Sequence, residues 1–114
     1  VNIKDVRETS IQLTDQFIKG VEQKCPMLQL ITPRIPENRG SQVSFSFKHG
    51  YAVMQACIER GVIGDFRAPD VMRFGFTPLF VDSQDVERAS EILAEIMSKD
   101  LWNDPKFQKR NKVT

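Results

Sequence analysis

The chain has few of the residues that build metal and redox sites. Its 114 residues include two cysteines and one histidine. Cys25 and Cys57 lack the two-residue spacing of a zinc or redox pair, and the histidine is not at ligand spacing from either. We therefore predict no metal site, and we expect Cys57 to be a buried free thiol because it falls on the apolar side of a helical pattern. His49 has no partner at a spacing that would indicate a catalytic triad, so we expect a solvated or cap-adjacent side chain.

Excess charge and long hydrophobic runs are also lacking. The formal net charge of +1 gives no reason to expect nucleic acid or an anionic membrane as partner. No apolar run approaches the ~20 residues that span a bilayer, and no signal-peptide pattern opens the chain. Reduced cysteines in such a chain fit a cytoplasmic protein. Because the chain starts with Val1 and enters a helical pattern almost at once, we expect a piece of a longer protein.

What is present is the composition of one globular domain. Hydrophobic residues make up 40% and charged residues 27% of a chain long enough to bury a single core. The segment 103–114 is polar and rich in Lys and Arg, so we expect a frayed or disordered tail after a domain of residues 1–102.

Helical and strand patterns alternate along the chain. Helical periodicity covers residues 3–24, 50–60 and about 82–99. Strand patterns cover residues 27–31, 42–47, 62–66 and the run that begins at residue 71. The last two strands, joined by a turn at 67–70, look like a hairpin. The order α-β-β-α-β-β-α predicts an α+β domain with a small, mainly antiparallel sheet covered on one face by helices.

The run from Val71 to Phe80 contains a single cation in an otherwise apolar strand pattern. Met72, Phe74 and Phe76 share one face, so Arg73 and Gly75 point the other way. A guanidinium on a rigid strand, with a glycine leaving space beside it, suits bidentate binding of a carboxylate or phosphate. The alternative is an arginine that is simply exposed or is paired with an internal Asp or Glu.

Charged residues also flank the predicted hairpin. For Asp65, Arg67 and Asp70 we expect a local ion pair and turn capping; the alternative is that Asp65 or Asp70 orients Arg67.

Three segments resemble the kynureninase family. They are residues 39–45 (RGSQVSF), residues 59–70 (ERGVIGDFRAPD), and the Arg73 strand with Thr77-Pro78-Leu79-Phe80. The resemblance covers nearly the whole chain but only the C-terminal part of the family's length. It implies the small C-terminal domain of a fold-type I pyridoxal-phosphate enzyme, which closes over the substrate. The family commonly has Tyr where this chain has Phe80, so we give Phe80 no catalytic role.

The resemblance implies a hydrolase of tryptophan catabolism, in the kynurenine pathway that leads to NAD biosynthesis. The complete enzyme would cleave kynurenine or 3-hydroxykynurenine, kynurenine giving anthranilate and alanine, and it would be a homodimer. Arg73 would bind the α-carboxylate of the substrate, with Gly75, Arg67 and Asp65 as candidate supporting residues. In the family the cofactor lysine lies in the large domain, and no lysine of this chain lies in a matching segment, so the resemblance implies that pyridoxal phosphate is bound by the large domain. The fragment alone is therefore expected to be inactive, with no catalytic residue of its own.

Two other interpretations stay open at this point. One is the small domain of another fold-type I enzyme, such as a cysteine desulfurase or an aminotransferase. The other is a stand-alone module that binds an amino acid for regulation. A reading frame with a cofactor lysine several hundred residues upstream would distinguish the enzymes from the module.

Overall fold

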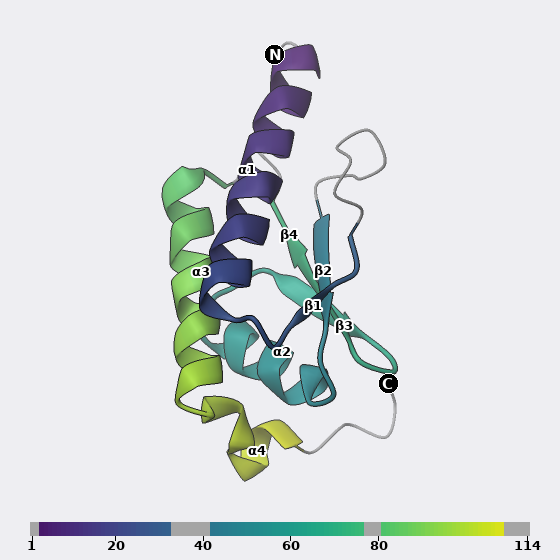
Figure 1. Ribbon diagram of the computed structural model, residues 1–114, viewed down its shortest axis with the longest axis vertical. Helices are drawn as coiled ribbons and strands as arrows, with labels where there is room; N and C mark the ends of the chain where they lie inside the picture. The colour runs from purple at the N-terminus through teal and green to yellow at the C-terminus, as the bar shows by residue number, and fades with distance from the viewer. Residues whose placement is uncertain (1–2, 33–41, 77–80, 109–114) are drawn as a thin grey trace.

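A computed structural model describes residues 3–32, 42–76 and 81–108 of the chain (Figure 1). The predicted loop at 33–40, the matching residues 39–41 and Phe80 lie outside these ranges. In chain order the elements are α1 (Ile3–Lys24), β1 (Gln29–Leu30), β2 (Gln42–Ser46), α2 (Gly50–Glu59), β3 (Gly64–Arg67), β4 (Val71–Gly75), α3 (Ser83–Ser98), the 3₁₀ turn η2 (Leu101–Asn103) and α4 (Pro105–Gln108). The first seven follow the predicted order, and the α+β class is confirmed.

The four strands form one antiparallel sheet in the order β1-β2-β4-β3. β4 therefore lies inside the sheet, hydrogen-bonded to β2 on one side and β3 on the other. The predicted hairpin is the β3–β4 pair, whose turn contains a cis peptide between Ala68 and Pro69. The register sets Arg73 directly opposite Ser44 on β2 and Asp65 on β3.

The core lies between one face of this sheet and the helices. Phe17 of α1 contacts three aromatic rings of the sheet, with centroid distances of 6.3 Å to Phe45, 5.0 Å to Phe74 and 4.6 Å to Phe76. Met72 of the same face is fully buried beside the start of α2. The predicted inward face of Met72, Phe74 and Phe76 is thus confirmed, and it is the face that α1 and α2 cover. Burying side chains of this size contributes roughly 1.5–3 kcal/mol each.

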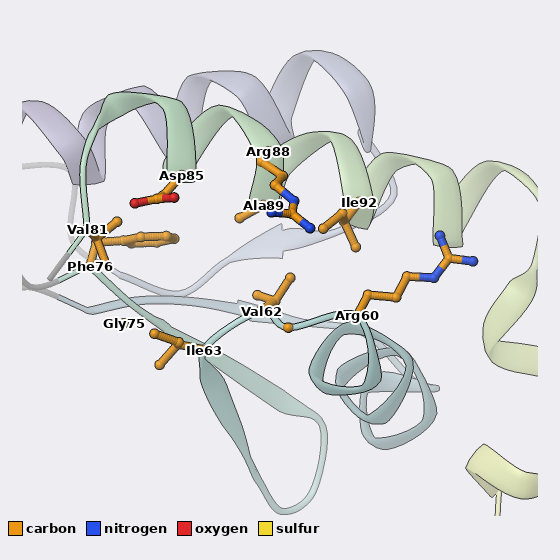
Figure 2. A pocket seen from close by; sticks show the side chains of 11 residues that line it. Arg60, Val62, Ile63, Gly75, Phe76, Val81, Asp85, Arg88, Ala89 and Ile92 are labelled. Atoms are coloured by element: carbon orange, nitrogen blue, oxygen red, sulfur yellow. The ribbon is translucent and has the colours of Figure 1, made fainter.

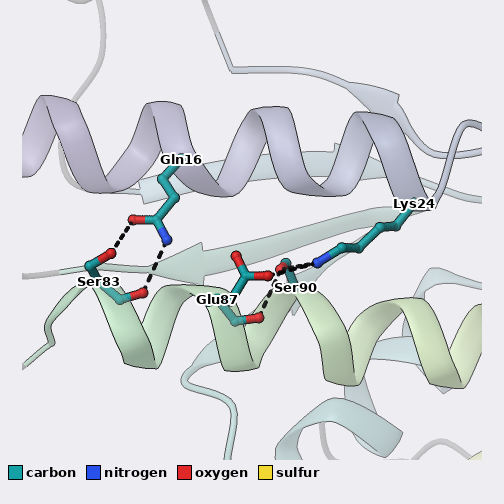
Figure 3. A network of polar contacts seen from close by, with 5 residues as sticks. All are labelled: Gln16, Lys24, Ser83, Glu87 and Ser90. Carbon is teal, nitrogen blue, oxygen red and sulfur yellow. Dashed lines mark hydrogen bonds and ion pairs between the residues drawn. The ribbon is translucent and has the colours of Figure 1, made fainter.

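α3 packs along α1 and is joined to it by polar contacts near both ends of the shared length (Figure 3). Gln16 Nε2 donates to the Ser83 carbonyl at 3.0 Å, and Ser83 Oγ donates back to Gln16 Oε1 at 2.9 Å. At the other end, Lys24 Nζ donates to Glu87 Oε1 and Ser90 Oγ, both at 3.1 Å. These contacts fix the register of the two helices.

The ends of two strands differ from the prediction. β1 is limited to Gln29–Leu30 instead of 27–31, and β3 runs over Gly64–Arg67 instead of 62–66. The shift in β3 follows from the end of α2, because Val62 N–H donates to the Cys57 carbonyl at 3.0 Å and so completes the helix terminus. Gly61, with φ of 91°, has the left-handed conformation expected there.

Part of the predicted tail is ordered, which corrects the expectation of a frayed segment from residue 103. Residues 105–108 form α4, and Lys106 Nζ on this helix donates to Glu59 Oε1 on α2 at 3.1 Å. Trp102, in the 3₁₀ turn η2 before α4, lies against Phe47 with ring centroids 6.0 Å apart. Tertiary contacts therefore hold the chain to residue 108 despite its polar composition. Residues 109–114 lie outside the described part.

Candidate functional site

The site is built on the sheet face opposite the core, which we call the outer face. It carries the even-numbered positions of β2, the odd-numbered positions of β3 and β4, and Gln29 and Ile31 at the β1 edge. α1 and α2 both pack on the other face, and α3 packs against them, so no helix among the described residues covers the outer face. The outer face is therefore the surface on which this domain presents Arg73.

Arg73 is held by a carboxylate from the neighbouring strand. Its Nε donates to Asp65 Oδ1 at 2.7 Å and its Nη2 donates to Asp65 Oδ2 at 2.6 Å. The side chain of Arg73 is 26% exposed and that of Asp65 54%. Hydrogen bonding from Arg73 lowers the pKa of Asp65, and the same bond raises the pKa of Arg73. The predicted alternative, in which the arginine is paired with an internal carboxylate, is thus present in the structure.

The pair with Asp65 occupies only one edge of the guanidinium. An arginine has five N–H donors, and Asp65 accepts from two of them. Nη1 has no acceptor among the described residues. Gly75, two positions along the strand, adds no side chain here, and among the described residues a Cβ built on it would meet only Ile63 Cγ2, at 3.9 Å. Within residues 3–32, 42–76 and 81–108, the guanidinium therefore has one edge without an acceptor, and no described side chain fills the position beside it at Gly75.

A close approach of two strands fixes the backbone on which Arg73 stands. A Cβ on Gly64 would collide with the Arg73 carbonyl oxygen and would lie 2.9 Å from Met54 Cε. Only glycine lets β3 and β4 approach this closely while α2 packs beneath them. Gly64 therefore sets the position of Arg73 from the neighbouring strand.

The other charged residues of the hairpin are arranged differently from the prediction. Asp65 pairs with Arg73 and not with Arg67, although the charge of Arg67 helps to lower the pKa of Asp65. Within the described residues neither Arg67 nor Asp70 forms an ion pair. The backbone carbonyl of Asp70 accepts a hydrogen bond from the Phe47 N–H at 3.0 Å. Sequence reasoning missed the Asp65–Arg73 pair. A hairpin register centred on Pro69 would have indicated it.

A cavity of about 240 Å³ lies between the end of β4 and α3 (Figure 2). Gly75 and Ile63 line it, but Arg73 does not. Of its two arginines, Arg60 donates to Glu95 at 3.0 Å, and Arg88 has no ion-pair partner in the described part of the chain. The cavity is thus adjacent to the Arg73 site and separate from it.

The two cysteines and the histidine pack against other residues of the domain. Cys25 and Cys57 are both buried and free, and burial raises their pKa values to about 11 and about 12. His49 precedes α2 and stacks on Trp102 with ring centroids 4.5 Å apart, without a side-chain cap bond. Among residues 3–32, 42–76 and 81–108, no three His, Cys, Asp or Glu side chains form a group that could hold a metal ion. None of the helices described is long and apolar enough to cross a membrane.

None of the four described strands contains a lysine. Lys24 and Lys106 are engaged with carboxylates on helices, far along the chain from the hairpin. A cofactor that needs a lysine Schiff base thus finds no fitting residue beside Arg73.

Comparison with known proteins agrees with the resemblance found in the sequence. A family model described as the kynureninase C-terminal domain matches residues 6–93. A kynureninase from Pseudomonas fluorescens is 50% identical over 115 residues, which covers 99% of this chain and 28% of that protein. A kynureninase from Burkholderia mallei strain SAVP1 is 50% identical over 111 residues, covering 96% of this chain and 27% of that protein. The chain thus spans little more than a quarter of the length of these relatives, and it belongs to the kynureninase C-terminal domain family.

Proposed function

We propose that this domain is the substrate-closing part of a complete kynureninase, in which Arg73 binds the α-carboxylate of kynurenine or 3-hydroxykynurenine. The observation that carries the proposal is the open edge of the Arg73 guanidinium on a sheet face that no described helix covers. A guanidinium edge and a carboxylate match in shape and charge, and two parallel N–H···O bonds fix the orientation of the bound group.

Binding through Arg73 would orient the amino-acid end of the substrate relative to the reacting bond. β4 is hydrogen-bonded on both sides, so the Arg73 backbone is part of a rigid element. Holding a reactant in a productive orientation can lower a barrier by several kcal/mol, within a limit of roughly 7–11 kcal/mol. The role of this chain would be recognition and orientation, and we assign no bond-breaking group to it.

The outer face has the properties of a surface that packs against another domain. Ile31 at the β1 edge is 49% exposed and Ile63 before β3 is 63% exposed, and both lie on the side of Arg73. Apolar side chains around a central cation favour contact with a domain that supplies both a packing surface and a ligand. We therefore assign the large domain of the same chain to this face.

The cofactor belongs to the part of the enzyme outside this chain. Pyridoxal phosphate, when bound, supplies an electron sink for cleavage of the amino-acid side chain. The strands around Arg73 carry no lysine that could form its Schiff base, so the part of this chain is limited to the substrate. We also propose that the complete enzyme is a cytoplasmic homodimer of the kynurenine pathway.

Arg73→Ala and Arg73→Lys variants of the full-length enzyme test the proposal. Hydrogen bonds to charged groups contribute about 1.5–3 kcal/mol, so Arg73→Ala should lower kcat/KM for kynurenine by about 10–150-fold. Lysine has no planar fork, so Arg73→Lys should recover little of this loss. Arg88→Ala, which removes a cation outside the outer face, should behave as wild type. Wild-type turnover and KM in both Arg73 variants would remove Arg73 from the site.

A further inference from the structure

We propose that Asp65 is a positioning residue: it holds the Arg73 guanidinium so that its open edge meets the carboxylate of the substrate. This inference rests on the proposed function of Arg73 and concerns how the arginine is oriented. Asp65 would not touch the substrate, and its effect would be transmitted entirely through Arg73.

The Asp65–Arg73 pair uses one edge of the guanidinium. A second carboxylate, that of the substrate, can bind the other edge. Asp65 accepts from Nε at 2.7 Å and from Nη2 at 2.6 Å, which is the side edge of the planar group. The end edge, formed by Nη1 and the second hydrogen of Nη2, remains available. A substrate carboxylate can therefore bind in the same plane without displacing Asp65.

Little else orients the Arg73 side chain. On the outer face, Ser44 stands directly across on β2 and Gly75 two positions along β4, so the side chains on these two sides of Arg73 are small. Gly75 contributes no side chain to this side, and among the described residues a Cβ there would contact only Ile63 Cγ2. Among the described residues, Asp65 is the hydrogen-bonding partner of the guanidinium, and it acts on both Nε and Nη2.

The position of Asp65 is itself determined by the sheet. Asp65 stands directly opposite Arg73 in the β3–β4 register, and the adjacent Gly64 allows the two strands to approach. The hydrogen bond from Arg73 lowers the pKa of Asp65, so the carboxylate is ionised at neutral pH and keeps the guanidinium in place. A one-residue shift of the register would move Asp65 to the core face and abolish the contact.

Two opposite effects on substrate binding distinguish positioning from competition. If Asp65 positions Arg73, its removal releases the guanidinium and weakens substrate binding. If Asp65 instead competes with the substrate for the arginine, its removal frees a charge and strengthens binding. The sign of the change in KM therefore decides between the two.

The test is the kinetics of the full-length enzyme with Asp65→Asn, a nearly isosteric change, and Asp65→Ala. Positioning predicts about a 5–30-fold rise in KM for kynurenine, a smaller loss than that expected on removing Arg73 itself, with kcat within about twofold of wild type. Glu95→Gln is the matched control, because it breaks the exposed Arg60–Glu95 pair, which joins α2 and α3 and leaves the outer face intact. That variant should keep the wild-type KM.

The same substitutions in an Arg73→Ala background separate positioning from a general structural effect. Because Asp65 acts through Arg73, Asp65→Asn should change KM by less than twofold once Arg73 is gone. An undiminished effect in that background, or an unchanged or lower KM in the single Asp65 variants, would overturn the inference. If Arg73→Ala alone left KM unchanged, the proposed function itself would fail, which is a separate outcome.

Discussion

The buried thiols show how strongly placement changes the chemistry of a residue. Cys25 and Cys57 sit in the core, and burial raises their pKa values to about 11 and about 12. At pH 8, only about one Cys25 in a thousand and one Cys57 in ten thousand would be thiolate, and the thiolate is the reactive form.

We therefore predict that both cysteines resist alkylation in the folded protein. At pH 8, iodoacetamide labelling of Cys25 and Cys57, followed by peptide mass spectrometry, should be at least about 100-fold slower than labelling of an exposed thiol. Labelling in denaturant serves as the control and should be complete for both. Rapid labelling of either residue in the native protein would contradict the buried placement.

For Arg73, the sequence predicted which face of the sheet the side chain occupies, but not which carboxylate it pairs with. The alternation of Met72, Phe74 and Phe76 assigns Arg73 to the opposite face, because strand side chains alternate with period two. The identity of its carboxylate depends on the register of the hairpin. A turn of four residues at 67–70 would pair Asp65 with Met72, whereas the three-residue connection found here pairs Asp65 with Arg73. A difference of one residue in a turn therefore changes which face Asp65 occupies relative to Arg73.

The element that positions the site is the β3–β4 hairpin, in which two glycines have different tasks. Gly64 permits close approach, since a Cβ there would collide with the Arg73 carbonyl oxygen. Gly75 lies on the outer face, where a Cβ would have its nearest neighbour among the described side chains at 3.9 Å.

These two glycines should respond differently to alanine. Gly64→Ala should lower the free energy of unfolding by about 1–3 kcal/mol, because an extra methyl is forced into a packed region. Gly75→Ala should leave stability within about 1 kcal/mol of wild type and should raise KM instead, since its methyl group enters the space beside the guanidinium. Urea denaturation and steady-state kinetics of the two variants measure this. Equal stability losses would contradict the distinction.

The ends of elements were harder to predict than their order. β3 begins at Gly64 because Val62 is used to close α2, a contact that depends on how the helix and the sheet meet. Similarly, the polar composition of 103–108 predicted a frayed tail, whereas α4 is held to α2 through Lys106 and Glu59. The α4 contact joins segments distant in the sequence, which local composition does not encode, whereas the start of β3 is set by a hydrogen bond between residues only five positions apart.

At the scale of the whole molecule, one face of the sheet is buried against the helices, and no described helix covers the outer face. Hydrophobic periodicity was sufficient to predict three helices over a small antiparallel sheet. Periodicity could not predict a function for the outer face, because the exposed Ile31 and Ile63 lie at strand ends and belong to no regular alternation. The kynureninase resemblance supplied that context.

Because we assign pyridoxal phosphate to the large domain, we predict that this domain alone does not bind the cofactor. Mixing the 114-residue domain with pyridoxal phosphate should give only the slow, non-specific absorbance changes of exposed lysines. The same measurement on the full-length enzyme should show a stable Schiff-base band. A stable band in the isolated domain that disappears on mutation of a single lysine would contradict the assignment of the cofactor to the large domain.

The most direct test of the central claim is the ability of the enzyme to discriminate between ligands with and without an α-carboxylate. Inhibition constants would be measured for a non-cleavable kynurenine analogue and for its counterpart lacking the carboxylate, in wild type and in Arg73→Ala. We predict that wild type prefers the carboxylate ligand by about 10–150-fold, the range expected for charged hydrogen bonds, and that Arg73→Ala binds the two ligands nearly equally. Full discrimination retained in Arg73→Ala would contradict the claim that Arg73 holds the carboxylate.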